Sequence, residues 1–387
     1  MPQQRRVALV HDFLLDLRGA ERVFLALCEL YPDAPIYTPV YDEAGTEGRF
    51  AHRDVRTSFL QKLRPTARTF RALLPFYPSA VESFDLSGYD LIVSSSSAWA
   101  HAVICDESAV HVSYCHNPFR YVWNDRDATL AQRDLVSAAA LRALFRRWRQ
   151  WDWIAAQRVN HYLTNSRTTQ ARIRAYFGRE SAVVHPPVDT SRFEPGEVGD
   201  HYLVLSELMP HKRIDMAVRA FNQLGRPLVV AGDGPDMRRL RRLAGPTVSF
   251  AGRVPDAEAA RLLQSCQALV VTGAEEFGIA AVEVQAAGRP AIAPSRGGAL
   301  ETVRDGVTGR LWDGDMDDLA NAIAGFDAAA VDSDACVVNA KRFDASVFRT
   351  AFPREVDKAL AEAAHRGHDH HAPRRPARMA WSPVNRR

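Results

Sequence analysis

The chain has 387 residues and a net charge of +3, and 47% of its residues are hydrophobic and 25% are charged. This length exceeds most single cores and fits two domains, and the composition is that of a globular protein with ample apolar material. The small net charge gives no reason to expect nucleic acid as a partner. Five scattered cysteines, odd in number and without metal-ligand spacing, favour a reducing compartment over a disulfide framework.

The N-terminal sequence is "MPQQRRVALVHDFLL". Its apolar run before His11 and Asp12 has only four residues, which predicts a first strand and not a signal peptide. No apolar run in the sequence approaches the roughly 18 residues of a membrane span. We therefore expect a cytoplasmic protein.

The first half of the chain predicts an α/β domain, which we place at residues 1–188. Its middle part is less regular than its two ends. The predicted strands cover 6–12, 90–99, 109–116, 159–166 and 181–189, and the predicted helices cover 19–32 and 166–178. Residues 185–200 contain three prolines and two glycines, which makes them the best candidate for a linker between domains.

The second half shows a clearer alternation of short apolar strands with helices of about ten residues, typical of a parallel, doubly wound sheet. We place this domain at 189–345. Its predicted strands cover 202–206, 227–235, 247–252, 267–273, 290–295 and 308–312, and its predicted helices cover 214–225, 236–245, 256–266, 277–288 and 299–306. Ligands of such sheets bind beyond the carboxyl ends of the strands.

The C-terminal end of the chain predicts a helix and a tail. We expect a helix at 346–364 that packs back on the N-terminal domain. Residues 365–387 carry six arginines, four histidines and three prolines without an apolar period, so we expect a disordered basic tail.

Two carboxylates in "AEEFGIAAVEVQAAGRP" (274–290) lie eight residues apart. Glu275 follows a predicted strand, and Glu283 lies inside an unusually apolar predicted helix. Glutamate is seldom buried without a partner, and a carboxylate can accept hydrogen bonds from two neighbouring hydroxyls. The pair therefore indicates either a solvated helix face or a site for sugar hydroxyls.

The stretch "EEFGIAAVEVQAAGRPAIAPSRGGALETVRDGVTG" (275–309) has the form E-x-F-G-x4-E followed by a glycine loop. This pattern resembles family 4, or group 1, of the retaining glycosyltransferases, and the resemblance extends in patches over about residues 1–350. It implies the GT-B fold, in which two Rossmann-like doubly wound domains face each other across a cleft. It also implies that Glu283 holds the nucleotide ribose and that Glu275 faces the donor sugar.

The same resemblance implies roles for further residues. Lys212 matches the lysine that faces the donor diphosphate, but Glu207 stands where the family has an arginine, and Arg213 is the substitute that we expect. His116 lies in "HNPFRYVW", which resembles a subgroup in which this histidine contacts the donor sugar. We therefore expect a catalytic set of Glu275, His116 and Lys212. The expected nucleotide-sugar contacts are Glu283, Gly19, Arg213, Gly278, Gly297, Gly298, Ala299 and Leu300.

The family implies transfer of a sugar from a nucleotide diphosphate to an acceptor hydroxyl with retention of configuration. The protein must then stabilise charge on the leaving diphosphate. We expect no protein nucleophile, no cofactor and no metal. GDP-mannose is a frequent donor for relatives of this subgroup, so we expect mannosyl transfer to a glycan or lipid-linked acceptor.

Two stretches, 57–78 and 141–153, mix basic and aromatic residues. Such a mixture suits an anionic bilayer surface, at the inner face of the plasma membrane, but it equally suits helices that pack on the sheet with solvated arginines.

Two other classes of protein are alternatives to a glycosyltransferase. One is a nucleotide-sugar epimerase of the same fold, and the other is a non-catalytic nucleotide-binding relative, suggested by the departures at Arg18 and Glu207.

Overall fold

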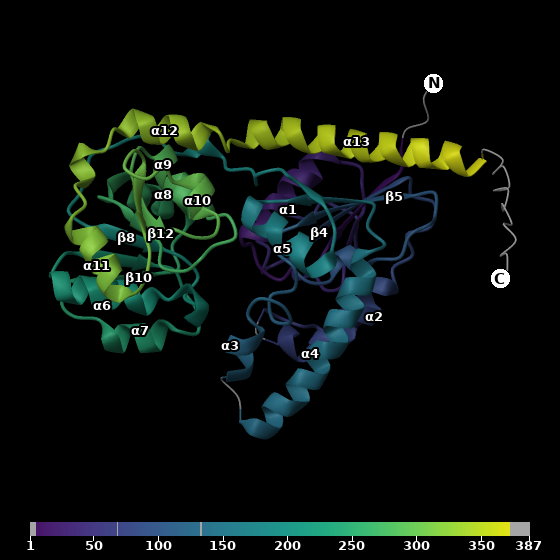
Figure 1. Cartoon of the computed structure of the whole chain (residues 1–387), viewed down its shortest axis with the longest axis horizontal. Coiled ribbons are helices and arrows are strands. Elements are labelled where there is room, and N and C mark those ends of the chain that lie inside the picture. The colour runs from purple at the N-terminus through teal and green to yellow at the C-terminus, as the bar shows by residue number, and fades with distance from the viewer. Residues whose placement is uncertain (1–4, 68, 132–133, 372–387) are drawn as a thin grey trace, which may run out of the picture.

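The computed structural model describes residues 5–67, 69–131 and 134–371. They form two parallel sheets, each covered by helices, which lie beside each other in Figure 1. The expected GT-B fold class is therefore confirmed. Both sheets have the strand order of a dinucleotide-binding domain, in which the first strand lies centrally and the chain winds outward in both directions.

The first sheet has the order β3-β2-β1-β4-β5-β6-β7, and its neighbouring strands pair in parallel. Its strands are β1 (Val7–His11), β2 (Ile36–Thr38), β3 (Val55–Thr57), β4 (Leu91–Ser96), β5 (Val110–Cys115), β6 (His161–Thr164) and β7 (Ser181–Val183). Its helices are α1 (Gly19–Leu30), α2 (Tyr77–Glu82), α3 (Arg126–Ala131), α4 (Leu135–Ala156) and α5 (Arg167–Phe177), with 3₁₀ turns η1 (Phe59–Leu63) and η2 (Phe70–Phe76).

The second sheet has the order β10-β9-β8-β11-β12-β13 and is also parallel. Its strands are β8 (Tyr202–Leu205), β9 (Leu228–Ala231), β10 (Val248–Gly252), β11 (Leu269–Val270), β12 (Ala291–Pro294) and β13 (Gly309–Trp312). Its helices are α6 (Ile214–Leu224), α7 (Met237–Leu243), α8 (Asp256–Ser265), α9 (Ile279–Ala286), α10 (Ala299–Thr302), α11 (Met316–Ala324) and α12 (Ser333–Lys341), with the 3₁₀ turn η5 (Pro210–Lys212).

Alternate residues of the central strands enter different cores, because successive side chains of a strand point to opposite faces. On β1, Ala8 and Val10 belong to one apolar cluster and Leu9 to another. On β8, Val204 belongs to one cluster and Leu203 to another. Each sheet is therefore buried on both faces, which leaves its edges and strand ends for a ligand.

Local signals in the sequence explain several helix ends. The Ser166 side chain accepts a hydrogen bond from the Thr169 amide at the start of α5. Gly178 and Gly225 end α5 and α6 with φ values of 65° and 64°, a conformation that glycine adopts at little cost. Each predicted strand is present, whereas β2, β3, α2, α3, α11 and α12 were not predicted. Helix α4 was expected only as one of two alternatives for residues 141–153.

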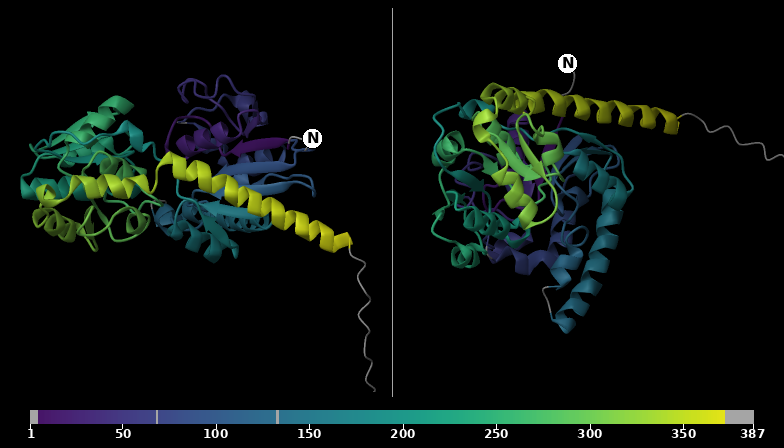
Figure 2. Two further views of the ribbon diagram at one scale, coloured as in Figure 1. Left: turned by 90° about the horizontal axis from the view of Figure 1, so that it is seen from above. Right: turned by 60° about the vertical axis from the view of Figure 1, so that its left-hand side comes forward.

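Helix α13 (Ala345–His371) lies along the outside of the first domain (Figures 1 and 2). Phe348, Phe352 and Val356 enter the same apolar cluster as Leu9 of β1. The helix runs past the predicted end at 364, so the expectation of a disordered tail from 365 is wrong for 365–371. The remainder of that predicted tail, 372–387, lies outside the described residues.

The chain passes between the domains twice, and the two passages lie side by side. The Val188 amide donates to the Phe343 carbonyl at 3.0 Å, and the Ala345 amide donates to the Val188 carbonyl at 2.9 Å.

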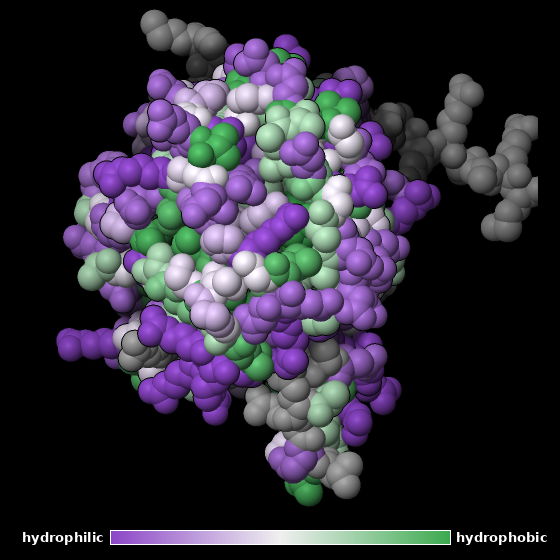
Figure 3. Space-filling model, turned by 90° about the vertical axis from the view of Figure 1, so that its left-hand side faces the viewer, coloured by the Kyte–Doolittle hydropathy of each residue, from purple (hydrophilic) through white to green (hydrophobic). Residues whose placement is uncertain are grey.

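The side of the molecule in Figure 3 mixes hydrophilic and hydrophobic residues. Among the described residues, no helix is long and apolar enough to cross a bilayer.

Candidate active site

Loops that follow the strands of one sheet contact loops that follow the strands of the other. Arg18, after β1, donates to Glu207, after β8, at 2.6 Å. Arg22, on α1, pairs with Asp256, at the start of α8, at 2.8 Å. The carboxyl ends of the two parallel sheets thus meet, and this is the place where ligands of doubly wound sheets bind.

Glu275 and Lys212, both expected in the catalytic set, contact each other. Lys212 Nζ lies 2.6 Å from Glu275 Oε2, and the side chains are only 19% and 25% exposed. Lys212 ends the 3₁₀ turn after β8, and Glu275 lies in the loop between β11 and α9. A lysine held beside a carboxylate is a compact positive charge that a phosphate can approach.

His116 follows β5 and is partly buried at the end of that strand. Its Nε2 lies 2.8 Å from Ser95 Oγ, and burial, together with the charge of His11, lowers the pKa of His116 to about 3. The imidazole is therefore neutral near pH 7. A neutral imidazole has one donor and one acceptor, which suits contact with a sugar hydroxyl.

Glu283 lies on α9 beside the Arg22–Asp256 ion pair that joins the domains. Burial raises the pKa of Glu283, and the charges of Arg22 and Arg192 oppose this shift. The Glu283 side chain forms no hydrogen bond or ion pair with any other residue that the structure describes. A partly buried carboxylate without a partner at a domain interface is available for ligand hydroxyls.

The glycine loop before α10 packs tightly on the loop that carries Glu275. A Cβ on Gly297 would lie 2.4 Å from the Glu275 carbonyl oxygen, and one on Gly298 would lie 2.3 Å from Phe277 Cα. The Gly298 amide donates to the Glu275 carbonyl at 2.9 Å. Both positions therefore require glycine, because a side chain would collide with the loop that carries Glu275. This requirement is independent of any contact with a phosphate. Ala299 is buried and Leu300 is exposed.

Gly19 and Gly278 begin helices on opposite domains. Gly19 is the first residue of α1, and a Cβ there would meet only Ile279 Cδ1, at 3.6 Å, an ordinary contact. The packing of the chain therefore does not require a glycine at this position. Gly278 precedes α9 with a φ of 90°, a conformation that other residues rarely adopt.

Arg213 pairs within its own loop and helix. Its Nε lies 3.4 Å from Asp215 Oδ1, and its side chain is 56% exposed. The cation that meets Glu207 is Arg18 from the other domain, which also pairs with Asp16 at 2.6 Å. The expectation that Arg213 substitutes for the family arginine at the diphosphate stays a prediction, and the structure adds Arg18 as a second candidate.

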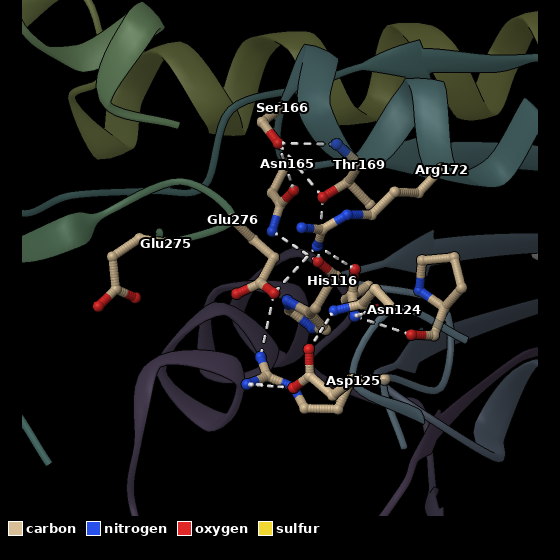
Figure 4. A network of polar contacts seen from close by, with 12 residues as sticks. His116, Asn124, Asp125, Asn165, Ser166, Thr169, Arg172, Glu275 and Glu276 are labelled. Atoms are coloured by element: carbon tan, nitrogen blue, oxygen red, sulfur yellow. Dashed lines mark hydrogen bonds and ion pairs between the residues drawn. The ribbon is translucent and has the colours of Figure 1, made fainter. Parts of the chain in front are cut away.

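A second group of polar residues beside the catalytic set was not predicted (Figure 4). Glu276 points toward His116 and the first domain, whereas Glu275 points away from this group. Arg120 and Arg172 each lie 3.1 Å from Glu276 Oε1. The sequence signal was present, since Arg120 belongs to the pattern around His116 and Glu276 occupies the variable position of E-x-F-G.

Comparison with known proteins identifies the two halves of the chain. Residues 17–192 match the model of Glycosyltransferase Family 4, and residues 200–326 match that of Glycosyl transferases group 1. The chain belongs to this glycosyltransferase family. The residues that the sequence resemblance singled out lie on the loops and helices just described, where the two sheets meet.

Curated relatives of this family member are similar over part of their length. A GDP-mannose-dependent alpha-(1-6)-phosphatidylinositol monomannoside mannosyltransferase of Mycolicibacterium smegmatis is 35% identical over 41% of this chain and 50% of that protein. A D-inositol 3-phosphate glycosyltransferase of Mycobacterium leprae is 30% identical over 51% of this chain and 54% of that protein. The chain spans about half the length of these relatives.

Solved glycosyltransferase structures share the fold. HepE of Anabaena in complex with UDP-glucose matches with a TM-score of 0.67 and 17% identity over 92% of this chain and all of that chain. Sucrose-phosphate synthase of Thermosynechococcus elongatus matches with a TM-score of 0.72 and 18% identity over 93% of this chain and all of that chain. At these identities the likeness shows the fold alone.

Proposed function

We propose that the protein is a retaining glycosyltransferase that moves a hexose from a nucleotide diphosphate sugar to a hydroxyl of a glycan or lipid-linked acceptor. The observation that carries the proposal is the pairing of Lys212 with Glu275 at 2.6 Å, eight residues before an unpaired carboxylate at Glu283. One end of the interface thus offers a cation for a diphosphate, and the other offers a carboxylate for a ribose.

In the proposed reaction, the bond between the anomeric carbon and the diphosphate oxygen breaks, and the acceptor oxygen forms the new bond on the same face. The acceptor proton passes to a phosphate oxygen, so no protein nucleophile is needed. Lys212 stabilises the charge of the leaving diphosphate. Glu275 and the neutral His116 orient the sugar. Neither a cofactor nor a metal takes part, and unchanged activity in EDTA would support the latter point.

We propose GDP-mannose as the donor. The M. smegmatis relative, which is 35% identical over 41% of this chain, is named as GDP-mannose-dependent. A thermal-shift panel with GDP, UDP and their sugars tests this choice. Stabilisation by UDP but not by GDP would reject GDP-mannose, and no stabilisation by either would reject the site.

Glu283→Ala is expected to weaken nucleotide binding about 10- to 100-fold, because the ribose hydroxyls would lose charge-assisted hydrogen bonds. Isothermal calorimetry with GDP measures the change. Glu258→Ala, on the neighbouring helix α8, removes a carboxylate that pairs with exposed Arg261 and serves as the control. Equal affinity of the two variants would contradict the role of Glu283.

We also propose contact of the first domain with an anionic membrane surface. In 57–78, Phe59, Leu63 and Phe76 are 47%, 64% and 55% exposed, and Lys62 and Arg64 are exposed between them. Apolar side chains beside basic ones fit the boundary of an anionic bilayer.

The second basic and aromatic stretch, 141–153, gives less support to membrane contact. Phe145 and Trp148 of α4 are buried in the core of the domain. Trp153 remains 49% exposed. For most of this stretch, packing on the sheet with solvated arginines is therefore the better account, and the membrane proposal rests on 57–78.

The double variant Phe59→Ser/Leu63→Ser is expected to reduce binding to vesicles that contain phosphatidylglycerol about tenfold, because two half-exposed apolar side chains no longer insert. Sedimentation at low salt measures the binding. Val338→Ser removes an apolar residue of α12 that is 63% exposed and controls for general surface effects. Absence of wild-type binding to these vesicles would end the membrane proposal.

A further inference from the structure

Glu276 joins the two domains at the sugar end of the proposed site. Its side chain is 16% exposed, and its Oε1 accepts from Arg120 Nη2 and Arg172 Nη1, each at 3.1 Å. Arg120 lies in the loop after β5, and Arg172 lies on α5. A single carboxylate of the second domain is therefore shared by two guanidinium groups of the first domain.

Each guanidinium has a further partner. Arg172 Nη1 donates to Asn117 Oδ1 at 2.6 Å. Arg120 Nη1 lies 3.1 Å from His211 Nε2, and because a guanidinium only donates, the imidazole nitrogen accepts. We name the group of Glu276, Arg120, Arg172, Asn117 and His211 the interdomain clasp.

Members of the clasp are the chain neighbours of the predicted catalytic set. Glu276 follows Glu275, and Asn117 follows His116. His211 precedes Lys212. Adjacent residues of one loop cannot move independently, so the contacts of the clasp set the separation of the loops that carry the three catalytic candidates.

Loss of a single contact of the clasp is costly, which favours states in which its ion pairs are all formed or all broken. A largely buried carboxylate that loses one guanidinium partner keeps the cost of its lost hydration. Burial acts to raise the pKa of Glu276, but the charges of Arg120, Lys212 and Arg172 outweigh it and lower that pKa. The carboxylate is therefore charged at neutral pH and holds both arginines.

We infer that Glu276 is a positioning residue for the donor sugar. Its carboxylate holds the loop of His116 against the loop of Glu275, and the sugar end of the site is complete only while the clasp is made. The nucleotide end, at Glu283, does not depend on it. This inference rests on the proposed function, since it names what orders the sugar contacts of that same site.

Glu276→Gln tests the inference, because it keeps the shape of the side chain and removes its charge. We expect kcat for release of GDP from GDP-mannose to fall about 10- to 100-fold, since a displacement of about 1 Å at a reacting centre has effects of this size. The Kd for GDP is expected to stay within about threefold by calorimetry. This split separates positioning from a general loss of fold.

A matched control and a double variant sharpen the result. Glu47→Gln removes a carboxylate that also pairs across the domains, with Arg253 at 3.7 Å, but is 60% exposed and far along the chain from the catalytic set. Its kcat is expected to stay within about twofold. Arg172→Gln should lower kcat as Glu276→Gln does. The loss in the double variant should be smaller than the product of the two single losses, because the variants share the contact between Arg172 and Glu276.

Several outcomes overturn the inference. An unchanged kcat in Glu276→Gln would show that the clasp does not contribute to turnover, and an increased kcat would show that it inhibits turnover. A parallel loss of GDP affinity and melting temperature would show that Glu276 only supports the fold. Failure of the wild-type protein to bind GDP or turn over GDP-mannose would reject the proposed function, and with it the role of Glu276 toward this donor.

Discussion

Replacement of Lys212 by glutamine is expected to lower kcat for donor turnover about 10²- to 10³-fold. The Lys212 side chain is 19% exposed and its ammonium group lies 2.6 Å from Glu275, so it is held in place before the reaction begins. Removal of one such preorganised donor to a developing negative charge has effects of this size. The variant also leaves Glu275 without its cation beside a diphosphate, which adds to the loss.

Steady-state kinetics of GDP release from GDP-mannose measures this change. Arg219→Gln removes an exposed cation from helix α6, which follows the same loop, and its kcat should match the wild type. Arg213→Gln tests whether the neighbouring cation contributes as much to turnover as Lys212 does. It should lose less than Lys212→Gln, because Arg213 is engaged by Asp215. A loss below tenfold for Lys212→Gln would remove Lys212 from the catalytic set.

The sequence predicted the fold well where a strand lies within an apolar run. The alternation of buried strands with helices located β8 to β13 in the second domain, and β1 and β4 to β7 in the first domain. It did not locate β2 and β3. Each has only three residues, and neither lies in a longer apolar run, because Pro35 and Pro39 flank β2 and Arg56 lies inside β3. Helix α4 was recognised only as a basic and aromatic stretch, since its arginines mask the apolar face that packs on Trp99.

Roles for Glu283 and Lys212 could be predicted only because the motifs around them resemble those of a known family, and these roles stay predictions. The structure brings Lys212 beside Glu275. Contacts between domains were not predictable in the same way, because they join residues more than a hundred positions apart. Glu276 and Arg172 are separated by 104 residues, and nothing in the chain near either one identifies the other.

The largest change that the structure makes to an expectation from the sequence concerns Glu207. A glutamate in place of the family arginine suggested a weakened or inactive relative that an arginine at 207 would restore. In the structure, Glu207 Oε1 is 2.6 Å from Arg18 Nη1, and Arg18 is also held by Asp16. The positive charge is thus present, but the first domain supplies it.

An exchange of these two charges is the test with the second largest expected effect. Arg18→Glu places three carboxylates beside the proposed diphosphate and should lower kcat/KM about 10²-fold, because a favourable charge becomes a repulsive one. Glu207→Arg alone should also lower activity, about fivefold, since it sets two guanidinium groups against each other. The double variant Arg18→Glu/Glu207→Arg restores the pair with the cation on the second domain.

Activity of the double variant decides between the two accounts of Glu207. Recovery to within about fivefold of the wild type, measured as GDP release from GDP-mannose, would show that the pair acts as a unit and that its polarity is secondary. The pair is only partly buried, with side chains 47% and 32% exposed, so either polarity can be solvated. A gain of activity in Glu207→Arg alone would contradict this account, because it would show that Arg18 does not supply the charge that the site needs.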